Sequence, residues 1–87
     1  MKSETKVKRL ERLFRGGSVM FAIARRATRS AISRTALIRS VAKATGASIK
    51  TIQSEISYLL NPEDPRNGHR VRMDSRVGNR RVRLVAA

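Results

Sequence analysis

The stretch that decides the fold runs from residue 35 to residue 60 and has the sequence TALIRSVAKATGASIKTIQSEISYLL. In its first half, apolar residues recur at the spacing of a helix face, at Leu37, Ile38, Val41 and Ala42. Gly46 ends this helix, because glycine adopts the left-handed backbone of a sharp turn at no steric cost. Ser48 is placed to cap the next helix, so two helices meet across a three-residue turn.

The second helix of this stretch, residues 48–60, has one apolar and one polar side. The residues expected on its inner face are Ile49, Ile52, Ile56, Leu59 and Leu60. Short or hydrogen-bonding side chains lie opposite them, at Lys50, Thr51, Gln53, Ser54 and Ser57. The pattern predicts a helix that packs on a core through one side and offers polar groups to a partner through the other.

Upstream of this pair, a further helix is predicted over Val19 to Ala27, with Ser18 as its N-cap. Its apolar residues Val19, Met20, Ile23 and Ala27 share one face. Residues 31–33 are expected to form a brief extended piece, which ends where Ser33 or Thr35 caps the following helix.

Downstream, Pro62 and Pro65 lie in a loop that neither a helix nor a central strand could cross. Beyond this loop the period changes to two, because Val71, Met73, Val82 and Leu84 alternate with polar residues. The alternation predicts a β-hairpin over residues 69–86. The expected fold is therefore mainly α with a C-terminal β-hairpin.

The register of the hairpin follows from its apolar residues. If Met73 faces Val82 and Val71 faces Leu84, the tip falls at residues 76–79. Gly78 or Asn79 is then expected to take the positive φ that a tight connection needs.

The spacing of Ala42, Gly46, Ile52 and Ile56 resembles the helix-turn-helix of DNA-binding repressors. A small residue lets the helices cross closely, glycine permits the turn, and the isoleucines anchor the second helix on the first. With the helix before it and the hairpin after it, the order of elements over residues 18–86 is similar to the winged-helix family. That resemblance implies a recognition helix in the major groove of DNA and a hairpin, or wing, on the flanking backbone or minor groove.

The resemblance also implies a division of the chain. Residues 18–87 are expected to form a winged helix-turn-helix domain, with the helix-turn-helix at 35–60 and the wing at 69–86. Residues 1–17 are expected to add an N-terminal basic amphipathic helix and a Gly-Gly joint, which the minimal winged-helix fold does not need.

Charge points to the same class of partner. The chain of 87 residues has 20 Lys and Arg against 6 Asp and Glu, a net charge of +14. Such an excess repels itself unless a polyanion offsets it. Fifteen of the cations are arginines, whose planar fork matches phosphate oxygens and the guanine edge. Phe14, Phe21 and Tyr58 are the only aromatic residues, so stacking platforms for unpaired bases are scarce.

Candidate DNA-contacting residues lie in two groups. Those of the recognition helix are Ser48, Lys50, Thr51, Gln53, Ser54 and Ser57. Gln53 is the sharpest candidate, because a glutamine can bond adenine N6 and N7 together, whereas capping alone explains Ser48. Those of the wing are Arg70, Arg72, Arg76, Arg80, Arg81 and Arg83.

The wing arginines are expected to differ in role. Four of them, Arg70, Arg72, Arg81 and Arg83, are expected to point outward as a like-charged cluster, which phosphate would relieve or which alternatively only keeps the strands soluble. Arg76 and Arg80, at the tip, suit a narrow minor groove.

Catalysis has little support. The only histidine, His69, lies near Glu63 and Asp64, but such residues in a loop more often cap, solubilise and hydrogen-bond. There are no cysteines and no glycine-rich phosphate loop. We therefore expect a binding protein with no cofactor and no metal, not an enzyme.

The N-terminal segment keeps an apolar stripe of Val7, Leu10, Leu13 and Phe14. The stripe could fold back on its own domain or pack against a second copy, in which case a homodimer would present two recognition helices to a palindromic site. No apolar run is long enough to cross a membrane. A cytoplasmic, nucleoid-associated location is expected.

Three functions fit these features. The first is a phage- or plasmid-type DNA-binding regulator of transcription or replication that acts by occupying a double-stranded site. The second is a basic inhibitor or adaptor directed at a host protein, such as a nucleic-acid enzyme. The third is a structural RNA-binding or nucleoid protein.

Overall fold

The computed structural model describes residues 13–78 and 80–87. The elements are α2 (Val19–Ala27), β1 (Ile32–Ser33), α3 (Arg34–Thr45), α4 (Ile49–Leu60), β2 (Val71–Met73), β3 (Arg81–Val82) and β4 (Leu84–Ala86). Their order is the expected one, except that the last strand is divided in two. No described helix is both long and apolar enough to cross a membrane. The fold is mainly helical, and its strands pair antiparallel.

A serine N-cap precedes each of the three helices in the described part of the chain. The hydroxyl oxygens of Ser18, Ser33 and Ser48 accept hydrogen bonds from backbone N–H groups three residues on, at 3.1, 3.1 and 3.2 Å. The caps expected at Ser18 and Ser48 are confirmed, and Ser33, not Thr35, caps α3. The helix boundaries were therefore predictable from local hydrogen bonding.

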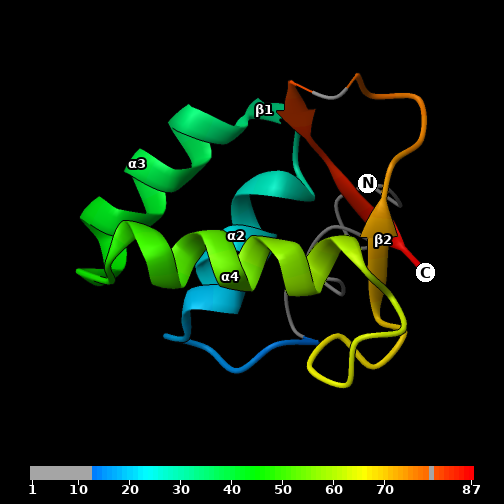
Figure 1. Ribbon diagram of the computed structural model, residues 1–87, viewed down its shortest axis with the longest axis horizontal. Helices are drawn as coiled ribbons and strands as arrows, with labels where there is room; N and C mark the ends of the chain where they lie inside the picture. The colour runs from blue at the N-terminus through cyan, green and yellow to red at the C-terminus, as the bar shows by residue number, and fades with distance from the viewer. Residues whose placement is uncertain (1–12, 79) are drawn as a thin grey trace.

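The turn between α3 and α4 has the backbone expected of it. Gly46 has φ of 72° and donates its N–H to the carbonyl of Ala42 at 2.8 Å. A side chain at this φ would be strained. The turn sends α4 back across α2 and α3 (Figure 1).

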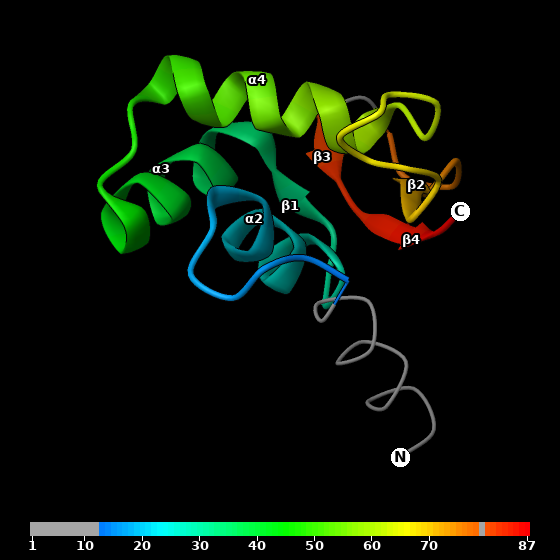
Figure 2. The ribbon, with the colours of Figure 1, turned by 90° about the horizontal axis from the view of Figure 1, so that it is seen from below.

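One core joins the helices to the strands. Each helix and three of the strands contribute fully buried side chains, among them Ile23, Leu37, Val41, Ile52, Leu59, Val71, Val82 and Leu84. The strands lie beside the C-terminal half of α4 (Figure 2). The core therefore fixes how the hairpin sits relative to α4.

Ile49 departs from the prediction that it faces inward. Its side chain is 59% exposed, whereas Ile52 and Ile56 are buried. Ile49 is the first residue of α4 and stands at the turn, one helical turn before the first α4 residue in the core. The helical period predicted its angle around the helix but not where the core ends along it.

The strands pair differently from the predicted hairpin. Met73 lies opposite Leu84 and Val71 opposite Ala86, while Val82 pairs with Ile32 of β1. The observed register is shifted by two residues, because β1 takes β3 as its partner and leaves β4 for β2. A shift of two keeps every side chain on its own face, so the inward prediction for the four apolar residues still holds.

The connection between β2 and β3 is longer than the predicted tip. Residues 74–80 form it, and its base is closed by the Asp74 N–H, which donates to the Arg83 carbonyl at 2.8 Å. Gly78 does not have a positive φ, contrary to the expectation. Asn79, the alternative, lies outside the described residues.

Asn67 ties the end of α4 to the start of β2. Its side chain is fully buried, and its Nδ2 donates to the carbonyls of Tyr58, Leu59 and Val71 at 3.2, 3.1 and 2.9 Å. Its Oδ1 accepts from the N–H groups of Arg70 and Val71 at 3.0 and 3.1 Å. One amide thus satisfies backbone groups on both sides of the loop, which would otherwise be buried without partners.

Replacing Asn67 by Ala should lower the free energy of unfolding by about 2–4 kcal/mol, because each buried polar group left without a partner costs about 1–3 kcal/mol. Asn67→Asp should act in the same direction, since a carboxylate cannot donate to three carbonyls. Urea unfolding followed by circular dichroism measures both. Asn61→Ala is the control; it removes one exposed hydrogen bond and should cost about 1 kcal/mol or less. Equal stability of the Asn67→Ala and Asn61→Ala proteins would contradict this role.

Candidate nucleic-acid interface

The solvent face of α4 carries the polar residues predicted for it. Lys50, Thr51, Gln53 and Ser57 are exposed, and Ser54 is half-buried. The opposite face is anchored by Ile52, Ile56 and Leu59, all buried. The exposed groups are therefore held on a rigid helix.

The serine hydroxyls on this helix are already engaged. Ser54 donates to the carbonyl of Lys50 at 3.1 Å, and Ser57 donates to that of Gln53 at 3.2 Å. Ser48 donates to the Thr51 hydroxyl at 2.9 Å while it caps the helix. In this arrangement Ser54 and Ser57 can only accept a hydrogen bond from a ligand.

Gln53 and Lys50 differ from these serines. Neither side chain makes a hydrogen bond or ion pair to the described residues. Their donors, and the Gln53 carbonyl, are free to meet an incoming group. Gln53 therefore keeps the donor and acceptor pair that an adenine edge requires.

A groove of about 340 Å³ runs between α3 and α4 beside Gln53. Arg34 and Thr35, the first residues of α3, line its other side. Neither was among the predicted contact residues. Arg34 could have been found, because a cation in the first turn of a helix is unfavourable against the helix dipole and is relieved by a nearby anion.

The three helix N-termini also lack acidic residues. None of α2, α3 and α4 has Asp or Glu in its first turn, where such residues would favour the helix dipole. The described acidic residues are Glu55, Glu63, Asp64 and Asp74. No carboxylate in these first turns offsets the positive end of a helix dipole.

Comparison with known proteins gives no further guide. No family model, curated protein or solved structure matches this chain.

The wing arginines do not form the cluster that was expected. Arg70, Arg72, Arg76, Arg80 and Arg81 are exposed, but Arg83 is half-buried. In the predicted register Arg72 would face Arg83; in the structure it faces Val85. The shift of two residues removes a like-charged pair and brings Arg83 beside Asp74.

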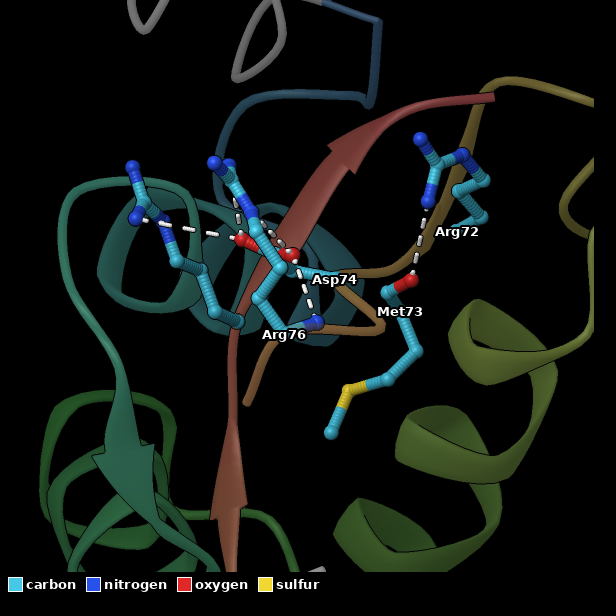
Figure 3. Close-up of polar contacts among 5 residues, drawn as sticks. Arg72, Met73, Asp74 and Arg76 are labelled. Carbon is cyan, nitrogen blue, oxygen red and sulfur yellow. Dashed lines mark hydrogen bonds and ion pairs between the residues drawn. The ribbon is translucent and has the colours of Figure 1, made fainter. Parts of the chain in front are cut away.

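Asp74 is the only described acidic residue from β2 to β4, and two arginines lie beside it. Its carboxylate is 3.3 Å from Nε of Arg76 and 3.9 Å from an Nη of Arg83, and it accepts the Arg76 N–H at 3.0 Å (Figure 3). The side chain of Asp74 is almost fully buried. Arg76 and Arg83 are therefore partly neutralised, while Arg80 and Arg81 have no acidic partner among the described residues.

Two other predictions concern residues away from the wing. Phe14 is buried in the core of its own chain and Leu13 is exposed, while Val7 and Leu10 lie outside the described residues. The homodimer therefore stays a prediction. His69 is exposed, and no group of three metal-ligating side chains is found in the described part of the chain.

The hydrogen bond from the backbone N–H of Arg76, together with the Arg76 side chain, holds the pKa of Asp74 below its ordinary value of 3.8. A carboxyl group with a lowered pKa stabilises the fold above its ordinary pKa, and that stability is lost as the pH falls through the lowered pKa.

Asp74→Asn should therefore lower the free energy of unfolding near neutral pH. The difference in this free energy between the variant and the natural sequence should shrink on acidification. Urea midpoints from about pH 6 to about pH 2 measure the difference. Glu63→Gln, which removes an exposed carboxylate without an ion pair to the described residues, is the control for net charge. A difference that is constant over this range would exclude the ionised carboxylate as the cause.

Proposed function

We propose that this chain is a sequence-specific DNA-binding regulator of the winged helix-turn-helix type. In this assignment α3 and α4 are the helix-turn-helix, α4 is the recognition helix, and the segment from β2 to β4 is the wing. The regulator acts by occupying double-stranded DNA.

The observation that carries the proposal is the solvent face of α4. A helix anchored by buried isoleucines presents Lys50 and Gln53 with their polar groups unengaged. The major groove of B-DNA admits an α-helix, and side chains of these types suit phosphate and base edges there. A purely solvated helix face would not need the surrounding excess of arginine.

Charge beside α4 supports the same assignment. Arg34 lies across a groove from Gln53, at the N-terminus of α3, where backbone N–H groups also favour an anion. Arg80 and Arg81 lie at the β2–β3 connection without acidic partners among the described residues. These cations suit the phosphates that flank a recognition helix, and phosphate contacts set its position while bases set specificity.

Binding to duplex DNA should be strongly salt-dependent. If about six to eight phosphates are neutralised, the logarithm of the association constant should fall against log salt with a slope of about −5 to −7. Fluorescence anisotropy with duplexes, in parallel with single-stranded RNA, measures this slope. A slope near zero would remove the nucleic-acid function and leave a protein-directed inhibitor or adaptor. Equal binding of all duplexes, or tighter binding of RNA, would favour the structural RNA or nucleoid protein.

Replacing Gln53 by Ala should reduce discrimination between the preferred duplex and others by about 1–3 kcal/mol, the value of a bidentate base contact. The melting temperature should hardly change, because the side chain is exposed. Arg81→Ala is the matched control: it should weaken all duplexes alike and make the salt slope shallower by about one. If Gln53→Ala also weakens all duplexes equally, α4 does not recognise base sequence through this residue.

A further inference from the structure

Ile49 is an exposed apolar side chain at the first residue of α4, beside the polar surface of this helix. It is 59% exposed, and Leu13, at 39%, is the only other large hydrophobic residue that is exposed in the described part of the chain. Its neighbours are the cap residue Ser48 and the free cation Lys50. The described part of the chain leaves more than half of its surface in solvent.

The stability of the helix does not explain an isoleucine at position 49. β-Branched residues lose rotamer freedom in helices, so isoleucine is not favoured by helix propensity. The first turn of a helix favours acidic residues through the dipole, and α4 has none there. Nor does the core require it, since the first buried residue of α4 is Ile52.

Ile49 and Gln53 lie on the same side of α4. They are four residues apart, and residues at that spacing are neighbours on a helix surface. The distance between them along the helix axis is about 6 Å, while successive base pairs of DNA are about 3.4 Å apart. A helix whose Gln53 meets a base edge in the major groove would bring Ile49 to a base within about two pairs of it.

The major groove offers one apolar group on its base edges, the 5-methyl group of thymine. We infer that Ile49 contacts the 5-methyl group of a pyrimidine within two base pairs of the base that Gln53 contacts. This inference rests on the proposed function and adds the ligand chemistry of the first turn of α4. A branched aliphatic side chain can bury a methyl group that a polar side chain would leave in water.

The experiment begins by selecting bound duplexes from a random DNA pool with the full chain. Each thymine of the enriched sequence is then replaced singly by deoxyuridine, which lacks only the methyl group. At one position this replacement should weaken binding about fourfold, the factor that corresponds to about 0.8 kcal/mol for one buried methyl. With Ile49→Ala the replacement at that position should have no effect.

Two controls make the result specific to Ile49. Leu13→Ala changes the other exposed large hydrophobic residue and should leave the deoxyuridine effect unchanged. Because Ile49 is exposed, Ile49→Ala should keep the melting temperature of the natural sequence, which excludes loss of folding. At the sensitive position, 5-methylcytosine should bind more tightly than cytosine, paired with guanine in both cases, by a similar factor.

The remaining outcomes separate this inference from the function on which it rests. A defined sequence that is enriched but shows no deoxyuridine effect, or the same effect with Ile49→Ala, overturns the contact and leaves the DNA-binding function standing. The contact is also overturned, and the DNA-binding function stands, if the enriched sequence has no thymine within two base pairs of the base whose recognition is lost in Gln53→Ala. If no sequence is enriched, sequence-specific binding and the contact both fail.

Discussion

The structure depends on how the side-chain amide of Asn67 joins two segments that have no regular backbone pairing with each other. It satisfies the carbonyls of Tyr58 and Leu59 at the end of α4 and both backbone groups of Val71 at the start of β2. An amide can do this because it donates and accepts at once. Asn67 is the only buried polar side chain of this loop, and it joins α4 to β2 in addition to the core that they share. The polar face of α4 and the strands therefore rest on the same core and the same amide.

The positive charge of the protein is arranged unevenly. In the wing, Asp74 offsets Arg76 and Arg83, so the number of arginines overstates the charge available to a ligand. On α4, few cations are present and hydrogen-bonding groups predominate. Under the proposed function, the arginines would attract the polyanion and the neutral groups of α4 would contact its bases, which are the two separate tasks of nucleic-acid recognition.

The features that could be predicted from sequence were those decided by neighbours in the chain. Serine caps, the Gly46 turn and most of each helical face depend on residues a few positions apart, and these were predicted correctly. The hairpin register was wrong because β1 competes for Val82 from a distant part of the chain. Asn67 looked like an ordinary loop residue, and Ile49 an ordinary core residue. The surroundings of both residues are made by tertiary packing, which the spacing of residues along the chain does not reveal.

The pairing of Ile32 with Val82 has a consequence for how the molecule forms. More than half of the chain lies between these two residues. Bringing them together therefore costs the entropy of closing a long loop, whereas the helices form from local contacts. The pairing of β1 with β3 therefore depends on the helices being in place. If this pair forms after the helices, a change that weakens β1 speeds unfolding more than it slows folding, even where every helix remains intact.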